Sequence, residues 1–233
     1  MTSASVSPSV KLSLYPSTDG EPVAETYVHL YAMLITLEVL RQYLVGQQAT
    51  VLSNQFLYYA AGFPKLRVAP DVMVIFDVEP GGRDNYKIWE EGQTPTVIFE
   101  MTSKGTQEQD QSFKKTLYEQ LDVQEYWLFD PKGEWISEKL RGYCLQGEQY
   151  VSITDNISHA LKLRLAVEDT LISFYRLDTD EKLLIPDELA TALAESNAQL
   201  AESTTQLEAE RQRRADLEAE LDRYRQQFGD LPG

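Results

Sequence analysis

Apolar side chains between residues 25 and 45 recur at the three- and four-residue spacing of a helix that buries one face. Gly46 follows and is a suitable end for that helix. Beyond it come short apolar runs, separated by turn residues such as Gly62-Phe63-Pro64. The extended runs predicted from this pattern are 50–52, 55–59, 72–76 and 96–101. A helix followed by several strands is the first part of the predicted fold.

The next part of the chain repeats the two kinds of element. Residues 107–121 are predicted to form a second amphipathic helix, with Phe113, Leu117 and Leu121 on one side. Residues 125–129 are a short apolar strand that Asp130-Pro131 ends. The order of helix, strands, helix and strand predicts a mixed sheet flanked by helices, in an α/β or α+β fold.

Residues 135–177 are predicted to add β structure. Residues 142–153 have the pattern of a hairpin whose turn lies at Gln146-Gly147-Glu148. Strict alternation of apolar residues from Leu161 to Val167 predicts a strand with one buried face. Residues 171–177 are expected to pair with it.

The C-terminal part differs in kind, since residues 187–228 contain no Gly or Pro and are rich in Ala, Glu, Leu, Gln and Arg. Two interleaved heptad series run through it. The leucine series is Leu193, Leu200, Leu207, Arg214, Leu221 and Phe228, and the companion series is Leu189, Ser196, Ser203, Glu210, Leu217 and Tyr224. The pattern predicts a helix about 60 Å long, which either pairs as a weak coiled coil in a homo-oligomer, most simply a dimer, or stays a solvated single helix.

These patterns divide the chain into three regions. Residues 1–20 are predicted to be a flexible leader, 21–177 the folded domain, and 178–233 the coiled-coil helix. A lone cysteine, Cys144, excludes an internal disulfide framework and fits a reducing compartment. The absence of a secretion signal and of an apolar run of about 20 residues predicts a cytoplasmic protein with no membrane span.

The net charge of −16 is shared between the regions. Residues 178–233 hold 14 acidic and 6 basic residues, which leaves the preceding 177 residues as acidic overall as the tail. A protein that binds nucleic acid nonspecifically and tightly usually has a basic face. The sequence therefore argues against avid nonspecific DNA binding, while a local basic patch at Lys104, Lys114 and Lys115 stays open.

Two acidic residues lie beside apolar strands, and a lysine lies on the second helix. Asp71 opens the run Val-Met-Val-Ile-Phe, and Glu100 follows Val-Ile-Phe. Two carboxylates at a sheet rim can hold a divalent cation, and Lys114 beside them would suit phosphodiester hydrolysis. Each residue also has a structural explanation: Asp71 as a strand cap, Glu100 as a solvent-facing strand end, and Lys114 as the partner of Asp110 one turn earlier.

The surrounding motifs resemble a known family. The segment PDV at 70–72 and the segment VIFEMTSKGTQEQDQSFKKTLYEQLDVQEYWLFDP at 97–131 resemble the Uma2 (DUF820) family, which is grouped with PD-(D/E)XK restriction-endonuclease-like nucleases. The matching positions are Pro70-Asp71, Glu100, Ser103, Asp110, Lys114, Tyr118, Val123, Glu125-Tyr126-Trp127 and Asp130-Pro131. Two positions depart from the pattern: Asp122 replaces a glycine, and Thr102 replaces the lysine that the superfamily carries two residues after the glutamate.

The resemblance implies a restriction-endonuclease-like core and a metal-dependent DNA endonuclease. Asp71, Glu100 and the carbonyl of Met101 would bind Mg²⁺ or Mn²⁺, and Glu25 would add a carboxylate from the first helix. Lys114 would be the catalytic lysine, with Lys104 as its rival.

Some roles and functions stay open. His29 is either an accessory or a structural histidine, and Tyr118 and Trp127 are interpreted as packing residues. One alternative function is an inactive nuclease-fold binding or assembly module that its coiled coil oligomerises. The other is a coiled-coil adaptor with structural carboxylates.

Overall fold

The computed structural model describes residues 14–19, 26–103 and 105–229. The chain divides into two compact units, residues 1–183 and 184–233. Within the described residues, the first unit holds three sheets and the helices that cover them, and the second is built on one long helix, α4 (Pro186–Phe228). Each unit is described separately below.

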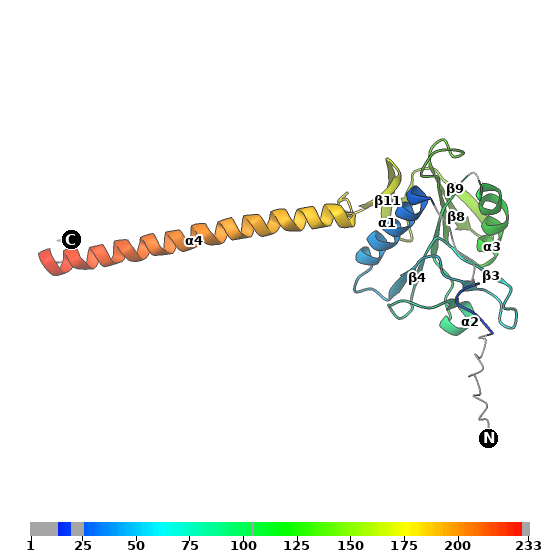
Figure 1. Cartoon of the computed structure of the whole chain (residues 1–233), viewed down its shortest axis with the longest axis horizontal. Coiled ribbons are helices and arrows are strands. Elements are labelled where there is room, and N and C mark those ends of the chain that lie inside the picture. Colours follow the sequence, from blue (N-terminus) through cyan, green and yellow to red (C-terminus); the bar gives the residue numbers. More distant parts are fainter. Residues whose placement is uncertain (1–13, 20–25, 104, 230–233) are drawn as a thin grey trace, which may run out of the picture. The chain divides into compact units, whose positions relative to one another are not determined.

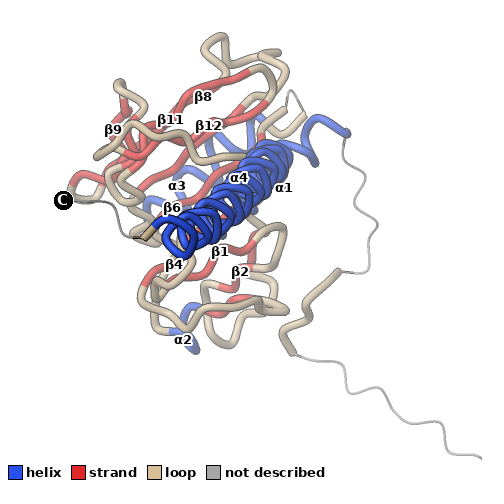
Figure 2. Tube along the Cα trace, turned by 90° about the vertical axis from the view of Figure 1, so that its left-hand side faces the viewer, coloured by secondary structure: helices blue, strands red, loops and turns tan. Residues whose placement is uncertain are grey.

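The first unit is organised around a six-stranded mixed sheet (Figure 2). In spatial order its strands are β1 (Ala49–Leu52), β4 (Val72–Phe76), β6 (Val97–Met101), β7 (Glu125–Phe129), β8 (Leu140–Gln146) and β9 (Gln149–Ile153). The pair β6·β7 is parallel, and the other neighbouring pairs of this sheet are antiparallel. The mixed sheet flanked by helices confirms the predicted fold class.

The central strands β6 and β7 are buried along their whole length, which explains their continuous apolar sequences. On one face, helix α1 (Tyr27–Tyr43) contacts β1, β4 and β6. On the other face, Ile98 and Leu128 join a core cluster with Leu117 and Tyr118 of the second helical segment. Figure 1 shows α1 and α3 on either side of the sheet. Because strand side chains alternate, Glu100 shares the α3 face with Ile98.

Two three-stranded sheets complete the first unit. One contains β10 (Ile157–Ser158), β11 (Leu163–Glu168) and β12 (Leu171–Arg176), and the other contains β3 (Arg67–Val68), β2 (Leu57–Tyr58) and β5 (Tyr86–Lys87), which leads into α2 (Ile88–Glu91). The predicted hairpins agree with β8–β9 and β11–β12. The extended run predicted at 55–59 is reduced to the two residues of β2.

The second predicted helix differs from expectation in its geometry. A π-helical segment, η1 (Gln109–Lys114), precedes a short α-helix, α3 (Lys115–Gln120). The wider π turn changes which side chains face the sheet. Phe113, which a regular helix would place on the apolar side, is 51% exposed, whereas Asp110 is buried. The prediction that Phe113 shares a buried face with Leu117 is therefore wrong.

Part of the predicted leader packs on the first unit. The Tyr15 ring lies edge-on against Tyr58 and beside Trp89, and the Tyr58 hydroxyl donates to the Pro16 carbonyl at 2.6 Å. Residues 1–13 and 20 of that region lie outside the described residues. Within the described parts of the chain, none of the helices combines the length and apolar character that crossing a bilayer requires.

Candidate active site

Asp71 and Glu100 lie next to each other because their strands are neighbours. Asp71 directly precedes β4, and Glu100 is the fourth residue of β6, which pairs with β4. The Met101 amide donates to Asp71 Oδ2 at 2.7 Å, and the Asp71 amide makes a long contact of 3.4 Å with Glu100 Oε2. The strand pairing thus brings the two predicted acids to one point at the end of the sheet.

Lys114 joins these carboxylates from the π-helical segment. Its Nζ lies 2.9 Å from Glu100 Oε2 and 3.0 Å from Asp110 Oδ1. The contact with Asp110 is an ion pair without hydrogen-bond geometry, since Oδ1 of Asp110 accepts no hydrogen bond from the described residues. The side chain of Glu100 is 1% exposed and that of Asp110 is 3% exposed. Removing the lysine charge would leave two buried carboxylates uncompensated, which is costly.

Two tyrosine hydroxyls donate hydrogen bonds to the same two acidic residues, Glu100 and Asp110. The Tyr118 hydroxyl donates to Glu100 Oε1 at 2.8 Å, and the Tyr126 hydroxyl donates to the Asp110 carbonyl at 3.0 Å. Tyr118 therefore both packs in the core and orients Glu100. The spacing between Lys114 and Tyr118, one helical turn, places both residues on the same helix face, but the second role depends on how that face packs against β6.

The electrostatics of the group follow from burial. Burial raises the pKa of the Glu100 carboxyl to about 8, because the charge of Lys114 only partly offsets desolvation and Asp71 raises the value further. Burial alone would lower the pKa of Lys114, but Glu100 and Asp110 raise it above its ordinary value. Burial and the charge of Glu100 raise the pKa of Tyr118 well above normal, so its phenol stays a donor.

The other predicted site residues have different outcomes. His29, in the first turn of α1, has its Nε2 3.6 Å from Asp71 Oδ2, so α1 contributes a side chain to the same place. Glu25 and Lys104 lie outside the described residues. Among the described residues, no cluster of three or more His, Cys, Asp or Glu side chains has the arrangement of a metal site. Of the carboxylates predicted to bind the metal, Asp71 and Glu100 lie among the described residues.

A pocket of about 330 Å³ opens beside His29. Thr102, Ser103, Asp130 and Lys132 contribute to its lining. The Thr102 hydroxyl oxygen is buried and has no hydrogen-bond partner among the described residues. This pocket lies beyond the end of β6, and His29 connects it to the Asp71 carboxylate.

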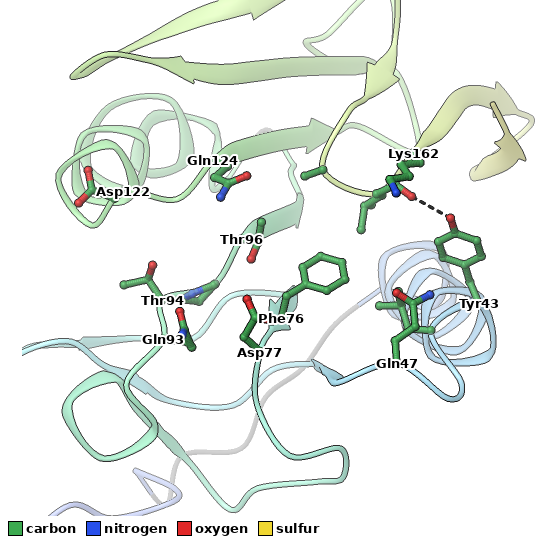
Figure 3. Close-up of a pocket in the computed structure, with 14 residues that line it drawn as sticks. Tyr43, Gln47, Phe76, Asp77, Gln93, Thr94, Thr96, Asp122, Gln124 and Lys162 are labelled. Carbon is green, nitrogen blue, oxygen red and sulfur yellow. Dashed lines mark hydrogen bonds between the residues drawn. The ribbon is translucent and has the colours of Figure 1, made fainter. Parts of the chain in front are cut away.

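A pocket of about 440 Å³ lies at the opposite ends of β6 and β7 (Figure 3). Thr96 and Gln124, which precede these strands, line it, together with Asp77 and Lys162. Figure 3 also shows the Tyr43 side chain at its edge, where the hydroxyl donates to the Leu161 carbonyl at 2.9 Å. The pocket is separated from Glu100 by the length of β6, so it does not belong to the carboxylate site.

Comparison with known proteins gives a family and, among the solved structures, a related crystal structure. The model of the Uma2 family, described as "Putative restriction endonuclease", matches residues 19–192. A crystal structure from Anabaena variabilis ATCC 29413, titled as a "putative nuclease belonging to DUF820", is similar to this chain. The similar region covers 60% of this chain and 77% of the chain in that structure. The identity is 14% and the TM-score 0.42. None of the curated proteins matches this chain.

Proposed function

Because the chain belongs to the Uma2 family, described as "Putative restriction endonuclease", we propose that it is a divalent-metal-dependent DNA endonuclease. Asp71 and Glu100 would hold the cation, and Lys114 would be the catalytic lysine. The observation that carries the proposal is the convergence of these three side chains from two neighbouring strands and a π-helical segment. Such π segments are frequent at functional sites.

The donor set fits a hard divalent cation. Mg²⁺ and Mn²⁺ prefer oxygen ligands and are often held by one or two carboxylates, with water completing the coordination. Asp71 and Glu100 supply two carboxylates, and the backbone carbonyl of Met101 is a further oxygen donor at the same strand end. A bound cation would lower the pKa of a water molecule and neutralise charge on the scissile phosphate.

The chain's own residues would then have distinct tasks. Tyr118 holds one oxygen of Glu100 and fixes the orientation of the carboxylate. The Met101 amide does the same for Asp71. Lys114, held charged by Glu100 and Asp110, supplies a positive charge against the negative charge that develops on the phosphate. The pocket beside His29, a residue whose Nε2 lies 3.6 Å from Asp71 Oδ2, would offer room for a substrate group.

The second candidate is a binding or assembly module that keeps the fold and lacks turnover. It is favoured by the closed ion-pair network: both Glu100 oxygens already have partners, in Tyr118 and Lys114. A structural role would explain this network without any cation. The two candidates differ in whether the site cleaves DNA, for which metal binding by the carboxylate pair is the first requirement.

Isothermal titration of the metal-free protein with Mg²⁺ or Mn²⁺ tests the proposal. We expect a single class of sites in the wild type and at least a tenfold loss of affinity in Asp71→Asn and Glu100→Gln, since each removes a charged ligand. Glu134→Gln is a matched control, because Glu134 is a partly exposed carboxylate beside the same pocket. Absence of binding, or equal affinity in all four proteins, would rule out the metal site.

Cleavage of supercoiled and single-stranded DNA then separates the candidates. We expect metal-dependent cleavage that EDTA abolishes and that Lys114→Met lowers by at least about a hundredfold, as is typical when a stabilising charge is lost from a transition state. Lys65→Met, which removes an exposed lysine that lines neither of the pockets described above, should cleave at the wild-type rate. Metal binding without cleavage in any of these proteins would favour the assembly module.

A further inference from the structure

Helix α4 exposes a regular line of apolar side chains. Every described side chain from Leu189 to Gln227 is exposed. These include leucines at seven-residue intervals, with Leu193 at 60%, Leu200 at 67% and Leu207 at 48% exposed. A helix that stays single in water gains nothing from leucine at every seventh position, because alanine has at least the same helix propensity. The regular spacing therefore indicates that this face is covered by a partner helix.

The two heptad series of α4 together form a seam, the line along which a partner helix would pack. The charges beside this seam identify the partner as a second copy in parallel orientation. In a parallel pair, the residue just before one seam position faces the residue five positions later on the other helix. Arg213 then faces Glu218 of the partner subunit, and Glu220 faces Arg225 of the partner subunit. By symmetry each pairing occurs twice, and no like charges meet at these flanking positions.

An antiparallel pair lacks this complementarity. When two copies of α4 overlap along their whole length in opposite directions, Arg213 faces Gln206 and Glu220 faces Gln199. The charges then have uncharged neighbours. Shifting the helices so that Arg213 faces Glu220 shortens the overlap and leaves Leu193 and Leu200 uncovered.

The polar seam positions fit the same arrangement. Glu210 and Arg214 occupy neighbouring layers of the seam, so in a parallel pair each Glu210 lies one layer from Arg214 of the partner subunit. Polar groups at seam positions lower the stability of a coiled coil but specify its register. Within one helix, Arg214 Nε lies 3.2 Å from Glu218 Oε1. In the parallel pair, the same Glu218 would also face Arg213 of the partner subunit.

We propose that α4 forms a parallel, in-register coiled-coil dimer with a second copy of this chain. The two heptad series make the seam, and the pairs Arg213–Glu218 and Glu220–Arg225 fix its direction. The dimer requires neither metal binding nor catalysis, so its test is independent of the proposed nuclease function.

Single-cysteine crosslinking in the full-length chain tests the orientation. Cys144 is the one cysteine in the sequence, so Cys144→Ser provides the background. In a parallel register Leu200→Cys faces its own copy, and mild oxidation should give mostly disulfide-linked dimer. Glu202→Cys, on the outer face, should give little. A disulfide that forms only when Leu200→Cys and Leu217→Cys are mixed would show an antiparallel pair and overturn the proposal.

Charge reversal tests the pairing by an independent readout. In sedimentation equilibrium, Glu220→Arg should raise the dimer Kd about tenfold, because two attractive contacts become repulsive. The double variant Glu220→Arg/Arg225→Glu should restore the wild-type Kd. Circular dichroism confirms that the helix persists in each variant. A wild-type chain that is monomeric at micromolar concentrations, or a double variant no tighter than the single, would contradict the dimer.

Discussion

A carboxyl group that is 1% exposed must be either protonated or compensated by a cation. The charges around Glu100 favour neither state completely. Lys114 supplies a positive charge at 2.9 Å, whereas Asp71 and Asp110 supply negative charges nearby. A divalent cation would shift this balance toward the ionised carboxylate. The same group thus links folding, proton binding and the proposed metal site.

The raised pKa of Glu100 predicts how stability changes with pH in metal-free protein. Because folding raises the pKa to about 8, the folded state holds this proton more tightly than the unfolded state. The resulting stabilisation is complete below the ordinary carboxyl pKa and is lost progressively as the pH rises to the folded value. Relative to Glu100→Gln, the wild-type free energy of unfolding should fall by roughly 3–4 kcal/mol between about pH 5 and pH 8, since each pH unit between the two pKa values contributes about 1.4 kcal/mol.

Urea denaturation in EDTA measures this difference. Glu134→Gln, which alters a carboxylate that is 45% exposed, should follow the wild-type pH dependence. If wild type and Glu100→Gln kept a constant difference across this range, Glu100 would have an ordinary pKa in the folded protein.

At the residue scale the sequence predicted which side chains meet, but not how they bond. The strand-end positions of Asp71 and Glu100 and the family pattern around Lys114 were sufficient to bring these three together. The hydrogen bond from Tyr118 to Glu100 depends on the phase of the helix against β6, which no local pattern specifies. The sequence therefore indicates only a packing role for Tyr118.

At the scale of elements, the π-helical segment η1 is the feature that sequence periodicity could not predict. The spacing of Phe113, Leu117 and Leu121 fits a regular helix, yet the chain buries Asp110 and exposes Phe113. The ion pair of Lys114 with two buried carboxylates stabilises this alternative phase. Tertiary contacts at the site thus override the local apolar pattern.

The packing of β8 on β7 depends on a glycine. Gly142 pairs with Trp127, and a Cβ atom at Gly142 would lie 2.4 Å from the Trp127 ring. The fully buried Trp127 ring is held on one face by stacking on Phe99 and at its edge by the indole N–H, which donates to Glu125 Oε2 at 3.1 Å. The ring therefore has little room to move away from an added methyl group.

Gly142→Ala should consequently destabilise the first unit by about 2–3 kcal/mol, the usual cost of overpacking a rigid core. Gly82→Ala is the matched control, because a Cβ there meets nothing within 4 Å and the backbone conformation suits alanine. Urea denaturation compares the two. A change below about 0.5 kcal/mol in Gly142→Ala would mean that β8 shifts to accommodate the methyl group.

At the scale of the whole molecule, the DNA substrate proposed above is a polyanion, whereas the chain itself has a net charge of −16. Repulsion of this kind disfavours nonspecific binding by a single copy. A dimer doubles the number of contacts available to one duplex, and the second contact becomes an intramolecular event. Oligomerisation through α4 is therefore expected to matter more for substrate engagement here than in a basic nuclease.

The orientation of the coiled coil has a consequence for cleavage, provided that the first unit is a nuclease. A parallel pair joins both first units to the same end of the helices, whereas an antiparallel pair joins them to ends about 60 Å apart. Two sites attached at one end can act on both strands of one duplex in a single encounter. The wild type should therefore convert supercoiled plasmid to linear DNA with little accumulation of the nicked form.

Leu200→Asp/Leu207→Asp places charges in the seam and should give mainly nicked plasmid, with the ratio of linear to nicked product lowered several-fold. Ala194→Asp/Ala201→Asp adds the same charge on the outer face of α4 and should keep the wild-type ratio. Because the catalytic residues are unchanged, the rate of the first nick per subunit at saturating DNA should be similar in all three proteins. If the two variants gave equal product ratios, cleavage of both DNA strands in one encounter would not depend on the coiled coil. It would then be assigned to contacts within the first unit.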